Sequence, residues 1–94
     1  EIFVYEEEQA VRGFAGLQGD YLAGIFVEQK FRSRGIGKRL LDEVKKTHPK
    51  LTLHVYRKNK GAAAFYEREG FRIAGEGVDE ATGEVEYTMS YTRK

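Results

Sequence analysis

The chain has 94 residues, with 16 basic and 15 acidic side chains, two histidines and no cysteine. This length suits one small domain, and the near-zero net charge gives no reason to expect a polyanionic partner such as nucleic acid. The lack of cysteine excludes disulfides, thiolate metal sites and a cysteine nucleophile. No apolar run is long enough to cross a membrane and no signal peptide is visible, so we expect a cytoplasmic protein without a membrane partner.

Three apolar runs at the start of the chain predict three strands of an antiparallel meander. Their ranges are Ile2–Tyr5, Ala10–Leu17 and Tyr21–Val27. The polar residues 6–9 and the sequence Gln18-Gly19-Asp20 are predicted turns, and the first of them is expected to be fully solvated. The third run is dense in apolar residues, which is typical of a central strand.

The next periodic segment predicts a helix over residues 36–46. Pro49 disfavours helical structure at His48, so the helix is expected to end there. A strand is predicted over Leu51–Tyr56, and a strand, helix and strand joined in this way predict a parallel pair with a right-handed crossover. The apolar stripe of the helix consists of Ile36, Leu40, Leu41 and Val44.

A second helix, predicted over Lys60–Glu69, has signals at both ends. Asn59 can cap its start, and Gly70 can end it in a left-handed conformation with Phe71 packing back. Two final strands, predicted over residues 71–78 and 84–91, flank a turn. Alternation in the last strand predicts one buried face.

The stretch over residues 31–39, with the sequence FRSRGIGKR, joins a predicted strand to a predicted helix and is the main candidate for a phosphate site. The first amides of a helix have no intrahelical partner, and the helix dipole adds partial positive charge there. Gly35 and Gly37 allow the backbone to approach an anion closely. The basic side chains around them are those of Arg32, Arg34, Lys38 and Arg39.

The spacing of this stretch excludes two common phosphate loops. A Walker A loop needs Gly at Arg32 and Ser or Thr at Arg39, and a dinucleotide-binding fingerprint needs a third glycine at Leu40. The remaining pattern, Arg32-x-x-Gly35-x-Gly37, resembles the Q/R-x-x-G-x-G/A pyrophosphate loop of the GNAT superfamily, the acyl-CoA-dependent N-acyltransferases. The alternative interpretation is a glycine-rich turn before an ordinary helix, which can have the same pattern.

A second motif, Asn59-x-x-Ala62-x-x-Phe65-Tyr66-x-x-x-Gly70-Phe71, resembles the second GNAT motif at every position. Both motifs stand in the order of the family, and the resemblance runs from about residue 1 to residue 91. It implies one GNAT-like N-acetyltransferase domain over residues 1–94. It also implies the GNAT fold, an α/β (α+β) sandwich whose mixed, mostly antiparallel sheet carries two helices and a splayed pair of parallel strands.

The resemblance implies acetyl-CoA as the acyl donor and no metal. In the family, the pantetheine arm of CoA enters the gap between the strands that match residues 21–27 and 51–56, and it pairs with their backbone groups. The alanines at positions 62 and 63 would let the second helix come close, although helix propensity explains them equally well. The implied cofactor-binding residues are Phe26, Val27, Arg32, Ser33, Arg34, Gly35, Ile36, Gly37, Lys38, Asn59, Ala62 and Tyr66.

Tyr66 is the candidate catalytic residue. In the family, the matching tyrosine donates a proton to the departing CoA thiolate, and a phenol with a pKa of about 10 is a reasonable donor in a desolvated gap. The alternative is an aromatic residue of the core. No general base can be assigned: Tyr21 stands where the histone-directed branch of the family has a glutamate. The nearby titratable groups are Asp20, Glu28 and His54, and a bound water is a further alternative.

The implied function is direct transfer of an acetyl group from acetyl-CoA to an amine. Small amines, lysine side chains, peptide N-termini and antibiotics all stay open as acceptors. The chain lacks the strand and helices that usually precede the meander in the family, so it is expected to be a compact form. A CoA-binding module without catalysis, and a protein-interaction domain such as a homodimer, therefore remain alternatives.

Overall fold

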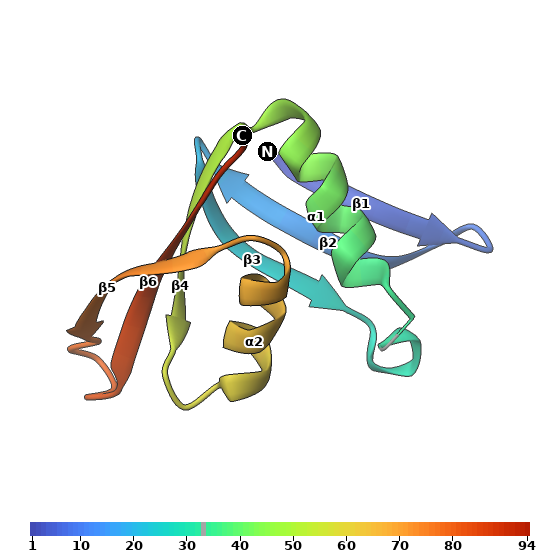
Figure 1. Cartoon of the computed structure of the whole chain (residues 1–94). Coiled ribbons are helices and arrows are strands. Elements are labelled where there is room, and N and C mark those ends of the chain that lie inside the picture. Colours follow the sequence, from blue (N-terminus) through green and yellow to red (C-terminus); the bar gives the residue numbers. More distant parts are fainter. Residues whose placement is uncertain (33) are drawn as a thin grey trace. The chain divides into compact units, whose positions relative to one another are not determined.

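The computed structural model describes residues 1–32 and 34–94, which form two compact units, Glu1–Pro49 and Lys50–Lys94. Within the described residues, each unit contains three strands and one α-helix (Figure 1). None of the described helices has the length and apolar character needed to cross a membrane.

The first unit begins with an antiparallel meander, which confirms the prediction. Its strands are β1 (Ile2–Glu7), β2 (Ala10–Gln18) and β3 (Tyr21–Val27). In the register of the meander, Val4 lies opposite Phe14, and Phe14 lies opposite Phe26.

The prediction that residues 6–9 form a solvated turn is wrong, because β1 continues through Glu7. Glu7 pairs with Ala10 on β2, so the turn consists only of Glu8 and Gln9. Both residues have left-handed backbone conformations, with φ of 55° and 65°. A two-residue hairpin that matches the twist of its strands requires this conformation, which residues other than glycine rarely adopt.

The helix α1 (Ile36–Thr47) lies across β1 and β2 (Figure 1). The predicted apolar stripe is buried, together with Ala15, Leu17 and Leu22 from the strands. The helix runs one residue beyond the predicted range, and the His48 amide closes its last turn by donating to the Val44 carbonyl at 3.0 Å.

Gly13 on β2 is the point of closest approach between the helix and the strands. A Cβ atom at this position would lie 2.9 Å from the Phe26 carbonyl oxygen and 3.2 Å from Cγ2 of Ile36. Real Cβ atoms do not come so near to backbone atoms, so only glycine fits. The helix therefore packs directly on bare backbone.

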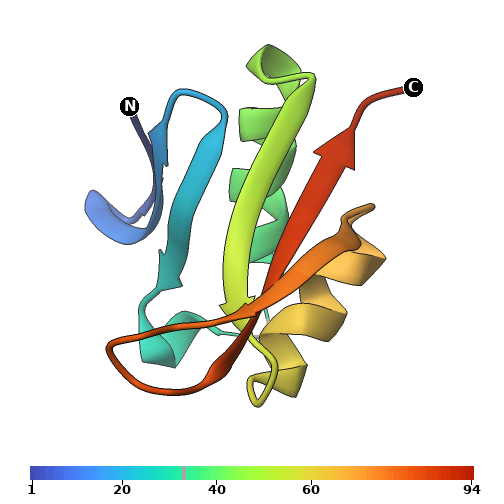
Figure 2. The ribbon, with the colours of Figure 1, turned by 90° about the vertical axis from the view of Figure 1, so that its left-hand side faces the viewer.

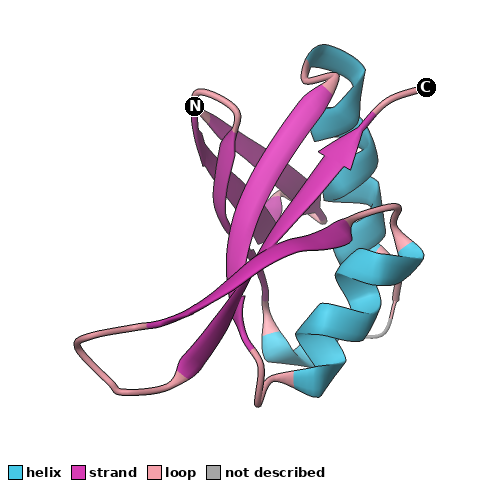
Figure 3. Ribbon diagram, turned by 60° about the vertical axis from the view of Figure 1, so that its left-hand side comes forward, coloured by secondary structure: helices cyan, strands magenta, loops and turns pink. Residues whose placement is uncertain are grey.

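The second unit contains β4 (Lys50–Tyr56), β5 (Arg72–Val78) and β6 (Val85–Thr92), each pairing antiparallel with its neighbour in the order β4-β6-β5 (Figure 2). The helix α2 (Lys60–Arg68) packs against β4 (Figure 3). On the predicted buried face of β6 only Met89 is fully buried, and the others are half-buried. The remaining core residues of this unit are Leu51, Leu53, Val55, Ala63 and Phe71.

The C-terminal end of α2 confirms the prediction for Gly70. Gly70 has a φ of 96°, and the Phe71 amide donates to the Tyr66 carbonyl at 3.0 Å. The Phe71 side chain is only 2% exposed, as expected for a hydrophobic residue that packs back onto the last turn of a helix.

We predict that Gly13→Ala destabilises the protein by about 1–3 kcal/mol, because the added methyl group must push α1 away from β2. The measurement is the free energy of unfolding from urea denaturation. Gly16→Ala is the matched control on the same strand, since a Cβ atom at Gly16 would have no neighbour within 4 Å. Equal losses in the two variants would contradict the close-packing argument.

Candidate functional site

The segment between β3 and α1 confirms the prediction of a strand that turns through glycine into a helix. A short 3₁₀ helix covers Gln29–Phe31, and Gly35 forms the N-cap of α1 with φ of 80° and ψ of 10°. A Cβ atom at Gly35 would meet nothing within 4 Å. Glycine is therefore needed here for its left-handed backbone and not for room.

The start of α1 carries no negative charge of its own in the described part of the chain. Among the described residues, no side chain caps this end, and the first turn contains no acidic residue. The first helical hydrogen bond runs from the Arg39 amide to the Gly35 carbonyl at 3.0 Å, so the amides of residues 36–38 have no acceptor within the helix. Together with the helix dipole, these amides form a favourable position for an anionic oxygen.

The amide of Arg32 differs from those of the helix start. It donates to the Gln29 carbonyl at 3.3 Å and so already has a partner. Ser33, a predicted cofactor-binding residue, lies outside the described residues. Within the described part of the predicted phosphate-binding stretch, the amides without an acceptor in their own helix are therefore those of the first turn of α1.

The four basic side chains near the helix start each contact a neutral or acidic group. The Arg32 Nε donates to the Val27 carbonyl at 3.4 Å, and the Arg39 Nη1 donates to the Tyr5 hydroxyl at 3.3 Å. Arg34 pairs with Glu7 at 3.6 Å, and Lys38 pairs with Asp42 at 3.5 Å. The Arg34 and Lys38 side chains are 53% and 60% exposed, so these ion pairs are weak and exchange readily for a more highly charged partner.

In the second unit, Asn59 caps α2 as predicted. Its side-chain oxygen accepts a hydrogen bond from the Ala62 amide at 3.1 Å. Only its side-chain NH₂ group is then left to donate to a ligand. Ala62 is half-buried and Ala63 is buried.

Tyr66 lies between two other aromatic rings. The ring centroids of Phe65 and Phe71 are 5.2 and 5.5 Å from its own, both in edge-to-face geometry. Among the described residues, none accepts a hydrogen bond from its hydroxyl group. Burial raises the pKa of Tyr66 above its ordinary value, which keeps the phenol protonated at neutral pH. It is therefore a proton donor without a partner inside its unit.

Sequence reasoning missed one hydrogen bond between distant residues of the second unit. The Tyr56 hydroxyl donates to the Asp79 carboxylate at 2.5 Å. This bond raises the pKa of Tyr56 and lowers the pKa of Asp79, because it stabilises the neutral phenol and the ionised carboxylate. It fixes the turn after β5 to the end of β4, and no local sequence pattern points to it.

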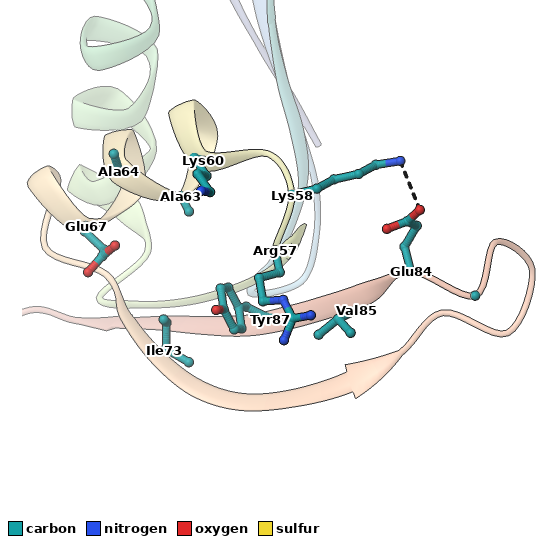
Figure 4. Close-up of a pocket in the computed structure, with 11 residues that line it drawn as sticks. Arg57, Lys58, Lys60, Ala63, Ala64, Glu67, Ile73, Glu84, Val85 and Tyr87 are labelled. Carbon is teal, nitrogen blue, oxygen red and sulfur yellow. Dashed lines mark ion pairs between the residues drawn. The ribbon is translucent and has the colours of Figure 1, made fainter.

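A groove of about 740 Å³ lies between α2 and the β5–β6 hairpin. Ala63 and Ala64 on the helix face Ile73 and Tyr87 on the strands, and a Lys58–Glu84 ion pair of 3.3 Å lies on its rim (Figure 4). None of the described residues predicted to bind the cofactor lines this groove. The candidate groups are therefore the helix start in the first unit and Tyr66 in the second, each considered within its own unit.

Comparison with protein families gives an independent test of the sequence resemblance. The model of the acetyltransferase (GNAT) domain family matches residues 1–73. The peptidyl-lysine N-acetyltransferase YiaC of Escherichia coli is 44% identical over 72 residues, which is 76% of this chain and 49% of that protein. The 5-NmdU N-acetyltransferase of Pseudomonas phage PaMx11 is 38% identical over 85 residues, with coverage of 82% and 61%. The chain spans about half the length of the curated relatives that it matches.

Solved structures agree with this assignment. Apo-form YjaB from Escherichia coli has a TM-score of 0.85 and 26% identity, covering 99% of this chain and 65% of that one. A Bacillus anthracis protein solved in complex with acetyl coenzyme A has a TM-score of 0.90 and 27% identity, with coverage of 99% and 62%. The predictions of the fold class and of the family are thus confirmed: this chain belongs to the GNAT acetyltransferase family.

Proposed function

We propose that this chain binds acetyl-CoA and transfers its acetyl group directly to an amine. One observation carries the proposal: α1 begins behind a left-handed Gly35 with amides that have no acceptor within the helix, and no side chain caps this end among the described residues. The comparisons support it, since curated relatives are named N-acetyltransferases and a structural neighbour was solved with acetyl coenzyme A.

The first unit supplies the groups for the diphosphate. In our proposal, the diphosphate oxygens accept hydrogen bonds from the amides of Ile36, Gly37 and Lys38, while Arg32 and Arg34 add full charges. The backbone of Phe26 and Val27, at the end of β3, pairs with the amides of the pantetheine arm. The remaining proposed contacts of this unit are Ser33 and Gly35.

The second unit supplies Asn59, Ala62 and Tyr66. In our proposal, Asn59 donates its side-chain NH₂ to the cofactor, and Ala62 leaves room for it. The gap between the strands at residues 21–27 and 51–56 involves both units, and it stays a prediction. The single domain over residues 1–94, a cytoplasmic location and a homodimer likewise stay predictions.

The proposed reaction forms one bond and breaks one bond. The amine nitrogen attacks the thioester carbonyl, whose developing negative charge the Val27 amide stabilises. The C–S bond then breaks, and Tyr66 gives its proton to the sulfur. The amine loses a proton to a base that we leave unassigned among Asp20, Glu28, His54 and water.

The acceptor to test first is a lysine side chain. Three of the curated relatives are named peptidyl-lysine N-acetyltransferases, and another is named for 5-NmdU. Lysine peptides with varied flanking residues, small amines and 5-NmdU form a suitable panel.

Two measurements test the proposal. Calorimetric titration should detect acetyl-CoA binding, and pantetheine, which lacks the diphosphate, should bind at least about tenfold more weakly. A thiol-release assay over the acceptor panel should then detect turnover. Binding without turnover on any amine would favour a CoA-binding module, whereas no binding at all would remove the proposed function.

We predict that Tyr66→Phe lowers kcat by about 10²–10⁴-fold, the usual contribution of a general acid, while the Kd for CoA stays within about twofold of the wild type. Tyr87→Phe is the matched control, because it removes the hydroxyl of another half-buried tyrosine in the same unit. Unchanged turnover in Tyr66→Phe would exclude Tyr66 from the chemistry.

We also predict that the pKa of Tyr66 lies above that of an ordinary tyrosine, because burial disfavours the phenolate. The unfolded chain loses this proton first, so the contribution of the neutral phenol to stability declines as pH rises through the folded-state pKa. The tyrosinate absorbance of the wild type minus that of Tyr66→Phe measures the ionisation directly. A difference signal whose midpoint lies at or below that of an ordinary tyrosine would contradict the raised pKa.

A further inference from the structure

Phe31, in the loop before α1, lies between two guanidinium groups. The Cζ atom of Arg12 is 4.3 Å from the centre of its ring, and the Cζ atom of Arg34 is 5.1 Å away. Both distances are within the range of cation–π attraction. We propose that Phe31 is a positioning residue that fixes this loop on the β1–β2 hairpin and so holds the diphosphate-binding amides of α1 in place, an inference that rests on the proposed function.

Arg12 anchors one side of the ring. It lies at an irregularity of β2, where the pairing with β1 passes from Gly13 directly to Val11. Its Nη1 pairs with Glu28 at 3.2 Å, and its carbonyl accepts from the Glu28 amide at 2.8 Å. The Arg12 side chain is only 19% exposed, and its Nε is buried without a hydrogen-bond partner among the described residues. A buried donor without a partner is unfavourable, so the ion pair and the aromatic contact must account for the conformation.

Arg34 anchors the other side and belongs to the loop itself. Its Nη1 lies 3.6 Å from Glu7 at the end of β1. The next two residues, Glu8 and Gln9, form the turn with left-handed backbones, and Glu8 lies 3.9 Å from Arg12. The hairpin tip thus presents carboxylates to both arginines.

These contacts connect residues on β1, β2 and the loop through one aromatic ring. The backbone supports them, because the Phe31 amide donates to the Glu28 carbonyl at 2.8 Å. Residues 29–32, when held in this way, do not have to be ordered as the diphosphate binds, so their ordering entropy does not reduce the affinity. A leucine at position 31 would keep most of the apolar contact but would lose the attraction to both guanidinium groups.

The test compares Phe31→Leu, Phe31→Tyr and Arg12→Met with the wild type. Calorimetry gives the Kd for CoA, and trypsin cleavage of the ligand-free protein after Lys30, Arg32 or Arg34 reports on loop order. We expect Phe31→Leu and Arg12→Met each to raise the Kd by about tenfold and to speed cleavage in the loop, with Phe31→Tyr close to the wild type. The double variant Phe31→Leu/Arg12→Met should raise the Kd by less than the product of the two single effects, because both substitutions remove the contact between Arg12 and Phe31.

Phe3→Leu is the matched control. Phe3 is a half-buried ring of the same unit, and it packs edge-to-face on His48 at the other end of α1, with the ring centroids 6.2 Å apart. It should lower stability without changing the Kd or the cleavage of the loop. If Phe3→Leu and Phe31→Leu changed the Kd and the cleavage rate equally, general destabilisation would explain the result and the proposal would be overturned.

The outcomes separate this inference from the proposed function. A wild type that binds CoA, with Phe31→Leu binding equally well, overturns the inference alone, even if the loop is cleaved faster. A wild type that does not bind CoA removes the proposed function and this inference with it. A raised Kd for CoA in Phe31→Leu, together with a Kd close to the wild type in Phe31→Tyr, supports the proposed function and this inference.

Discussion

The contact between α1 and the bare backbone of β2 at Gly13 is the constraint on which the first unit depends. Because no side chain separates them there, the Ile36 side chain at the start of the helix packs against strand backbone. The buried stripe that continues through Val44 then holds the whole helix at this distance. The position of the first helical turn, and with it the direction of its amides, follows from core packing and not from the loop alone.

The start of α1 departs from the usual pattern of helix capping, at the place where we expect the functional site. A helix start is ordinarily capped by Ser, Thr, Asp or Asn and carries acidic residues in its first turn. Here Gly35 caps it, no acidic residue follows in the first turn, and basic side chains surround it. Such an arrangement costs stability in the free protein, a cost that a bound anion would offset, and local rules are typically broken in this way at functional sites.

In the second unit, the packing at the end of α2 affects Tyr66, the proposed proton donor. Asn59 at its start and Gly70 at its end provide hydrogen-bond partners for terminal backbone groups of the helix. This stabilises a helix that is only a few turns long. Phe71, buried directly after the helix, packs against Tyr66 and contributes to the burial that raises the pKa of the phenol. The residues that end the helix therefore also help to raise the pKa of the proposed proton donor.

The sequence by itself determined most of what depends on near neighbours in the chain, with the turn after β1 as an exception. Two motifs identified the family, sequence patterns placed every strand and α-helix to within about two residues, and Gly70 marked the left-handed end of α2. The 3₁₀ helix at Gln29–Phe31 and the left-handed conformation of Gly35 were not predicted. Only the tertiary structure decided the contacts between distant segments, such as Arg12 with Phe31, Arg34 with Glu7 and Tyr56 with Asp79. The physical reason is that the pairing of strands brings distant residues together, and in the first unit the irregularity at Arg12 adds to this. A shift of one residue in register would send every side chain of a strand to the opposite face, and no local pattern encodes that choice.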